Sequence, residues 1–81
     1  MLAALLDDAS VSNQTRQRLG NKIKRLRLRH GWTQAECAER FGLNVTYLGL
    51  LERGHKNVCL DTLLIIAEGF GLSLGKLFSG I

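Results

Sequence analysis

The segment between Thr33 and Gly54 constrains the fold of this chain most, because it predicts two short helices joined by a tight turn. Thr33 is followed three residues later by Glu36, which is a capping box in which each side chain satisfies a backbone donor at a helix start. A helix is therefore expected to begin at Gln34. Gly42 ends this helix, since glycine readily adopts the left-handed conformation that helix ends commonly require.

A second helix follows the turn. Asn44 is a good N-cap for it, and the helix buries Leu48 and Leu51 before it ends near Gly54. The helix that begins at Gln34 has a small residue, Ala38, where two steeply crossing helices must approach each other. Its buried side consists of Cys37, Ala38 and Phe41. Two such helices joined by a short turn that contains glycine are typical of a helix-turn-helix.

With its flanking residues, the segment resembles the phage-repressor or Cro-like helix-turn-helix family, also called the XRE family. The resemblance covers roughly residues 19–78, and within it the runs TYLGLLERGHKN and VCLDTLLIIAEGFGLSLGKLF are similar to small controller proteins of restriction-modification systems and related short repressors. It implies an all-α fold, a compact five-helix bundle of the lambda-repressor-like DNA-binding type.

Length and charge agree with this interpretation. Eighty-one residues allow one domain with a small core, which dimerisation would help to stabilise. The net charge is +4, and seven of the eleven basic residues lie between Arg16 and Arg29, which suits a polyanion partner such as DNA. The alternative is that these residues form the solvated face of an amphipathic helix, and only the accompanying helix-turn-helix favours DNA.

The chain divides into an N-terminal arm of residues 1–12 and a DNA-binding domain of residues 13–81, with the helix-turn-helix at 33–54. The arm carries three leucines and is either a frayed end or a short segment that packs on its own core or on a second subunit. The first helix of the domain is expected at about 13–30 and to be closed by Gly31. Its inner side is formed by Leu19, Ile23, Leu26 and Leu28.

Two further helices complete the predicted bundle. A helix is expected from Leu60 to Phe70, poorly capped by Cys59, and Ser73 caps a short last helix that ends near Phe78. Trp32 precedes the helix-turn-helix and is expected to pack in the core. The residues expected on the inner side of the fourth helix are Leu60, Leu63, Ile66, Ala67 and Phe70.

Several kinds of site are not expected. Cys37 and Cys59 lack the spacing of a metal or redox motif and are interpreted as reduced, partly buried thiols. The chain has no paired nucleophile and base and no glycine-rich phosphate loop, so neither an enzyme nor a cofactor is expected. A small-molecule ligand is not expected either. Without a signal peptide or a membrane span, the protein is expected in the cytoplasm.

The resemblance also implies which residues contact DNA, because in this family the second helix of the motif lies in the major groove. The implied base contacts are Asn44, Val45, Thr46, Tyr47 and Leu50. The implied phosphate contacts are Gln34, Thr33, Lys56 and Asn57. Lys22 and Arg18 are less specific candidates, for which a solvated helix face is the alternative. Controller proteins typically have arginine in place of Val45, so a bidentate contact to guanine is missing, and direct base readout is expected to be thin.

The resemblance further implies a structural ion pair between Arg27 and Glu52 that ties the first helix to the third. Leu64 and Ile65 stand where relatives usually carry charged residues, and this apolar surface predicts a dimer interface or, as the rival explanation, packing under the N-terminal arm. The predicted interface residues are Leu64, Ile65, Leu74 and Phe78.

The expected function is that of a homodimeric transcriptional regulator on a pseudo-palindromic operator. The alternatives are an antitoxin-like protein-interaction module and a helix-turn-helix that has lost DNA binding.

Overall fold

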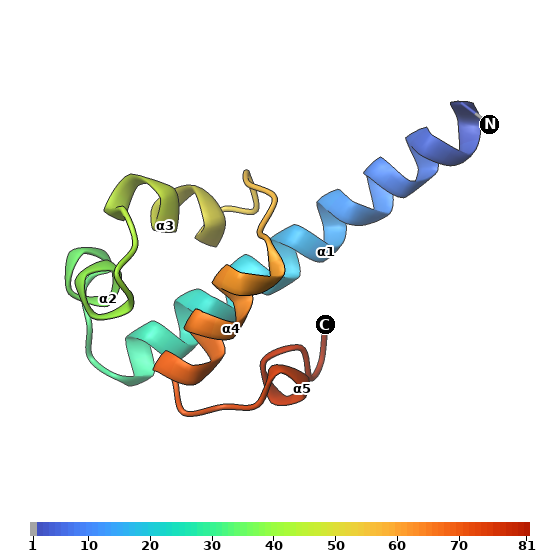
Figure 1. The fold of residues 1–81 in the computed structure, drawn as a ribbon. Helices are drawn as coiled ribbons and strands as arrows, with labels where there is room; N and C mark the ends of the chain where they lie inside the picture. The colour runs from blue at the N-terminus through green and yellow to red at the C-terminus, as the bar shows by residue number, and fades with distance from the viewer. Residues whose placement is uncertain (1) are drawn as a thin grey trace.

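The computed structural model describes the backbone of residues 2–81 and the side chains of residues 13–81. This part of the chain contains five α-helices and no strand (Figure 1), which confirms the predicted all-α, five-helix fold. The helices are α1 (Leu2–Arg29), α2 (Gln34–Phe41), α3 (Val45–Glu52), α4 (Leu60–Gly69) and α5 (Leu74–Leu77).

Helix α1 is longer than the sequence analysis predicts, because it begins at Leu2 rather than near residue 13. The stretch ahead of Leu19 contains no glycine or proline and several good helix formers, so nothing in it interrupts the helix. The predicted packing of the three N-terminal leucines falls on side chains outside the described residues. At the other end, Gly31 has a φ of 74°, in keeping with its predicted closing role.

The helix-turn-helix forms as predicted. Thr33 caps α2 with a complete capping box, and Gly42 ends the helix in the left-handed conformation at a φ of 68°. Asn44 then caps α3, which ends at Glu52, and Gly54 has a φ of 76°. The two helix starts and the turn are therefore fixed by local backbone and side-chain hydrogen bonds.

Helices α4 and α5 lie where they are expected, with two differences in burial. No side-chain hydrogen bond caps α4 at Cys59, and Ser73 caps α5, as predicted. Leu60, predicted on the inner side of α4, is 59% exposed because it lies in the first turn, ahead of the part that packs on the core. Cys59 is exposed rather than partly buried, whereas Cys37 is buried and its pKa is raised to about 11 by burial.

The core lies between α1 and the other four helices. Leu28, predicted on the inner side of α1, is 57% exposed, because it follows the buried Arg27 and is rotated by roughly 100° around the helix. Trp32 packs against the core as predicted, stacked on His30 with ring centroids 4.4 Å apart. The buried apolar residues are Leu19, Ile23, Cys37, Ala38, Phe41, Leu48, Leu51, Leu63, Ile66, Ala67, Phe70 and Leu77.

Gly20 allows α1 to approach α3 very closely. A β-carbon at this position would lie 2.4 Å from the carbonyl oxygen of Leu51 and 2.5 Å from that of Glu52. Backbone atoms of a neighbouring helix cannot move aside as a flexible side chain can. Glycine is therefore required at this position for α3 to sit on α1.

We expect Gly20→Ala to lower the free energy of unfolding by about 1–3 kcal/mol or more, because the added methyl group forces α1 and α3 apart. Gly75→Ala is the matched control: it lies in α5, and its β-carbon would meet nothing closer than 4.0 Å. Urea denaturation of both variants measures the effect. Equal stability of Gly20→Ala and the wild type would contradict the close approach of α1 to α3.

Candidate nucleic-acid interface

Asn44 uses its side-chain oxygen to cap α3. Its Oδ1 accepts hydrogen bonds from the backbone N–H of Thr46 at 2.8 Å and of Tyr47 at 3.2 Å. A bidentate contact to an adenine edge needs both the oxygen and the NH₂ group of an asparagine. Since the oxygen is already engaged, Asn44 has only its NH₂ group to offer to a base.

Three of the residues that the sequence analysis assigns to base contacts lie together on the outer side of α3. Val45 is 44% exposed, Thr46 is exposed and Leu50 is half-buried, whereas the opposite side of the helix is buried. Arg53 is exposed one residue beyond the helix end and follows Thr46 by seven positions, which returns it to the same side. Arg53 was not among the predicted contacts, although its spacing from Thr46 indicates that it lies on the outer side of α3.

Tyr47 does not join this outer surface. It is half-buried and packs against the core, with its phenol near Thr62 and Cys59 at the start of α4. Burial raises the pKa of its hydroxyl. The structure thus places Tyr47 on the α4 side of α3, and its contact with a base stays a prediction.

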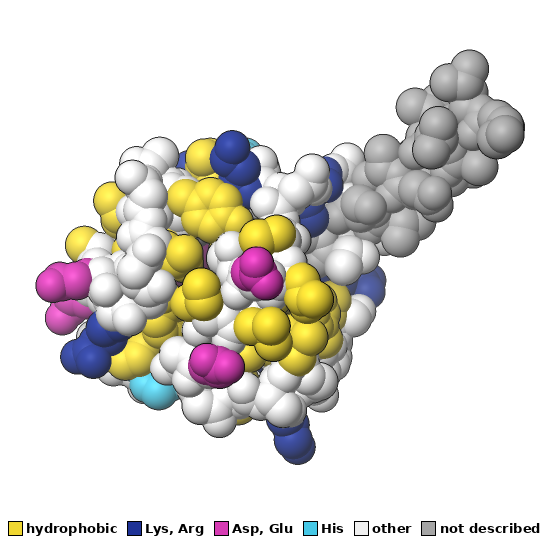
Figure 2. All heavy atoms as spheres, in the orientation of Figure 1, with side chains coloured by type: hydrophobic (Ala, Val, Ile, Leu, Met, Phe, Trp, Pro, Cys, Tyr) yellow, Lys and Arg dark blue, Asp and Glu magenta, His cyan; other side chains and the backbone are white. Residues whose placement is uncertain are grey.

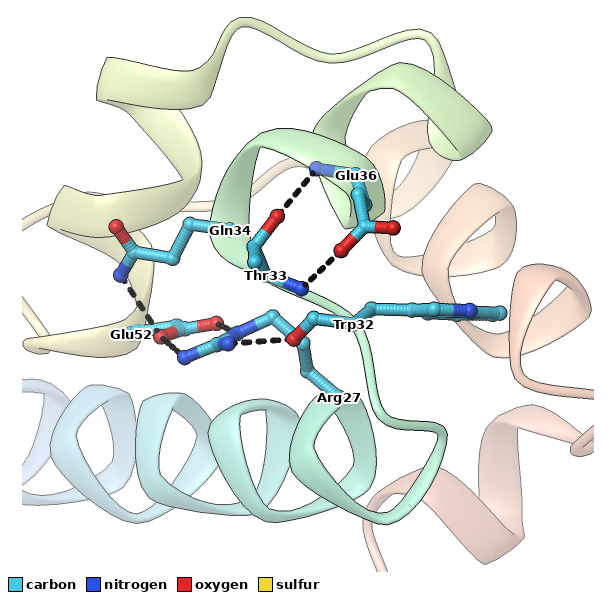
Figure 3. A network of polar contacts seen from close by, with 6 residues as sticks. All are labelled: Arg27, Trp32, Thr33, Gln34, Glu36 and Glu52. Atoms are coloured by element: carbon cyan, nitrogen blue, oxygen red, sulfur yellow. Dashed lines mark hydrogen bonds and ion pairs between the residues drawn. The ribbon is translucent and has the colours of Figure 1, made fainter.

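Arg27 and Glu52 form the predicted ion pair, which is the centre of a buried polar network (Figure 3). Arg27 Nε donates to Glu52 Oε2 at 2.7 Å, and its Nη2 donates to Oε1 at 3.1 Å. Arg27 Nη1 also donates to the carbonyl oxygen of Trp32 at 2.8 Å. The hydrogen bond to Glu52 raises the pKa of Arg27. One guanidinium therefore fixes α1, α3 and the segment that leads into α2.

Gln34 belongs to the same network. Its Nε2 donates to Glu52 Oε1 at 3.0 Å (Figure 3). The oxygen of its side-chain amide lies beside Gly49. The side chain is therefore held against α3. The backbone N–H groups in the first turn of α2 have no partner within the helix, apart from that of Glu36, which donates to Thr33 Oγ1. The phosphate contact at the start of α2 stays a prediction.

The capping box holds the start of α2. The Thr33 backbone N–H donates to Glu36 Oε1 at 3.0 Å, and the Glu36 N–H donates to Thr33 Oγ1 at 3.1 Å. The bond from the Thr33 N–H, above all, lowers the pKa of the Glu36 carboxyl. Because the Thr33 hydroxyl already accepts this bond, its predicted phosphate contact would use the hydrogen of the hydroxyl.

Lys22, predicted to contact a phosphate, lies elsewhere. Its Nζ donates to the carbonyl oxygens of Lys76 at 2.8 Å and Ser79 at 2.7 Å, and Arg18 Nη1 donates to the carbonyl oxygen of Ile81. Both cations therefore lie on the α5 side of α1. The contact of Lys22 with a phosphate stays a prediction.

A different lysine of α1 faces α2 and α3. Lys24 lines a polar cleft of about 450 Å³ together with Gln34 and Arg53. Lys24 was not among the predicted contacts. The polar residues Gln17, Asn21 and Lys24, at intervals of four and three positions, nevertheless mark one face of α1. The remaining residues that line this cleft are Gln17, Asn21, Glu52 and His55.

The loop after α3 carries the other two predicted phosphate contacts. Lys56 and Asn57 are both exposed. Asn57 Oδ1 accepts a hydrogen bond from Arg16 Nη1, which joins this loop to α1. The contacts of both residues with DNA stay predictions, and their exposure is compatible with them.

The predicted dimer surface is exposed in part. Leu64 is 40% and Ile65 is 43% exposed, and apolar side chains gather over α4 in Figure 2. Leu74 and Phe78 are half-buried and pack against the core. Leu60 adds an exposed apolar side chain to the start of the same helix.

The described residues contain no group of three or more histidine, cysteine, aspartate or glutamate side chains that could hold a metal ion. None of the helices in the described part is long and apolar enough to cross a membrane.

Comparisons with known proteins point to one family. The family model described as helix-turn-helix matches residues 23–77. Control protein C.MunI of a Mycoplasma species is 39% identical over 70 residues, which cover 85% of this chain and 95% of that protein. The propionyl-CoA carboxylase regulator of Cereibacter sphaeroides is 38% identical over 58 residues, which are 72% of this chain and only 13% of that protein.

A solved structure agrees with these relatives. The restriction-modification controller protein C.AhdI from Aeromonas hydrophila superimposes with a TM-score of 0.72 at 31% identity. The match covers 75% of this chain and 92% of that chain.

We expect Glu52→Ala to lower the free energy of unfolding by about 3–5 kcal/mol, because it leaves the buried Arg27 without its partner. Glu52→Gln keeps an acceptor for Arg27 and should lose less. Arg53→Ala, which changes the exposed neighbour, is the control and should stay within about 0.5 kcal/mol of the wild type. Chemical denaturation of the three variants provides the measurement. A Glu52→Ala protein as stable as the control would show that the ion pair does not tie the helices together.

Proposed function

We propose that this chain, which belongs to the helix-turn-helix family, acts as a homodimer on a two-fold symmetric operator. Its family membership and its similarity to controller proteins make it a DNA-binding transcriptional regulator. The observation that carries the proposal is the outer side of α3, which is exposed beside the open start of α2 and next to the cations Lys24 and Arg53. The site of action would be the cytoplasm, where operator DNA is present.

In the proposed complex, the first residues of α3 lie in the major groove. Val45 and Thr46 contact thymine methyl groups, the Thr46 hydroxyl adds a hydrogen bond, and Leu50 adds apolar contact farther along the helix. These contacts favour an operator rich in A·T pairs. The sequence-independent part of the affinity comes from phosphate contacts by the first turn of α2 and by the cations beside it. The proposed phosphate contacts are Thr33, Gln34, Lys24, Arg53, Lys56 and Asn57.

A homodimer is proposed because exposed apolar side chains on α4 require a cover. Leu60, Leu64 and Ile65 are each at least 40% exposed on a ten-residue helix. The other proposed members of the interface are Leu74 of the neighbouring α5 and Phe78, which follows that helix. A two-fold axis through this face would present two α3 helices to one side of a duplex, roughly 34 Å apart. The similarity to controller proteins supports regulation through protein concentration.

We expect selection from random-sequence duplexes to enrich a two-fold symmetric, A·T-rich site. Lys56→Ala should weaken binding to every duplex alike and reduce the salt slope by about 0.9, because it removes one phosphate contact. Thr46→Ala should instead change the preferred sequence. Lys76→Ala removes the same charge from α5 and is the matched control. The proposal fails if no sequence is enriched.

We expect the double change Leu64→Glu and Ile65→Glu to give a folded monomer with much weaker operator binding, because like charges would face each other across the two-fold axis. Light scattering measures the mass, and Leu28→Glu, which places one negative charge on an exposed apolar position of α1, is the control. If the α4 variant stays a dimer and binds DNA, the apolar face serves another protein, as in the antitoxin-like alternative.

A further inference from the structure

A stripe of four cations runs along the side of α1 that the operator interface does not use. Its members follow one another at intervals of four, three and four residues, which keeps them on one face of a helix. All but Lys22 are exposed, and Lys22 is half-buried. The stripe spans roughly 16 Å, because a helix rises about 1.5 Å per residue. We call these four residues the α1 stripe: Arg18, Lys22, Arg25 and Arg29.

The α1 stripe faces away from α3. Gly20 marks the side of α1 that touches α3, since a β-carbon there would collide with the Leu51 carbonyl. Arg18 and Lys22 each lie two residues from Gly20 and thus about 200° around the helix. Their hydrogen bonds to the carbonyl oxygens of Ile81, Lys76 and Ser79 place them instead along the C-terminal segment. A duplex bound by α3 cannot reach this side of the protein.

The charge of the α1 stripe is not compensated within the described residues. No acidic residue occurs between 13 and 29, and the one salt bridge of the described part joins Arg27 to Glu52 on the buried side. Like charges three and four residues apart repel each other on a helix. Lys22, Arg25 and Arg29 also line a shallow cleft of about 300 Å³, whose remaining lining residue is Leu26. The stripe is therefore a cationic surface that a polyanion would stabilise.

We propose that the α1 stripe binds the phosphate backbone of a second double-stranded DNA segment while α3 holds the first. This surface adds a second DNA contact to the proposed function. The contact does not depend on whether α3 recognises a particular base sequence. Bound in this way, the protein bridges two duplexes.

The composition of the stripe favours DNA over an acidic protein. Protein interfaces have an apolar centre, whereas every member of the stripe is cationic, and three of the four are arginines that bind phosphate through a fork of donors. Leu28, the exposed apolar residue in the described part of this helix, lies beside the stripe rather than within it, about 60° around α1 from Arg25. A linear row of cations without sequence-reading groups matches the uniform charge of a duplex backbone.

The first test removes the α3-side cations and asks what binding is left. In the background Lys24→Gln, Arg53→Gln and Lys56→Gln, a fluorescent 20-base-pair random duplex should still bind at low salt. Adding Arg25→Glu should weaken this residual binding by about tenfold or more. Adding Arg40→Glu, an equal charge change on α2, should weaken it by no more than about twofold. Circular dichroism establishes that each variant is folded.

The second test measures bridging by the chain with an intact α3 side. A bead-bound duplex should capture the wild type and, through it, a labelled second duplex. Arg25→Glu should abolish capture of the second duplex while the beads retain as much protein as before.

The proposal would be overturned if the folded background variant showed no residual duplex binding. It would also be overturned if Arg25→Glu and Arg40→Glu weakened the residual binding equally. A third contradicting result is that the protein binds poly-glutamate in a way that depends on Arg25 but does not bind DNA. The last result would assign the stripe to an acidic protein. Loss of sequence enrichment by the wild type would count against the proposed function alone, because neither test here uses an operator.

Discussion

The ion pair between Arg27 and Glu52 is the interaction on which the geometry of the interface depends. Glu52 accepts from Arg27 on α1 and from Gln34 on α2, while it sits itself on α3. Arg27 also holds the Trp32 carbonyl ahead of the α2 cap. One buried carboxylate thus joins three helices. It fixes the position of the start of α2 relative to the outer side of α3. A rigid arrangement of this kind is what simultaneous contact with phosphates and base edges requires.

The features that the sequence predicts well are those decided within a few residues. The capping box, the Asn44 cap, the left-handed Gly42 and the missing cap at Cys59 each depend on local hydrogen bonds, and all were confirmed. The family resemblance supplied the one long-range contact, the Arg27–Glu52 pair. Its burial shows why a resemblance can predict it: neither charge is tolerable there without the other.

The structure adds most to the sequence where rotation around a helix decides which way a side chain faces. Lys22 and Lys24 differ by two positions, yet the first bonds to the C-terminal segment and the second lines the cleft beside Gln34. Tyr47 turns toward α4 although its neighbours Val45 and Thr46 face outward. The sequence gives the charge or the aromatic ring at each position, but the packed helices determine the direction it faces. The partners across those helices are distant in sequence, so local patterns do not reveal them.

The proposed contacts of α3 favour a homodimer, because one subunit alone would give little specificity. Apolar contacts from Val45 and Leu50 would discriminate weakly between bases, and the cap that Asn44 forms removes its bidentate contact. Phosphate contacts raise the affinity for all sequences together and so add no discrimination. A half-site contacted by so few groups gives a small ratio of specific to non-specific affinity. Two half-sites related by a two-fold axis roughly square this ratio, because the discrimination energies of well-separated half-sites add. In the proposed homodimer, the exposed apolar face of α4 would therefore be as important to operator choice as α3 itself.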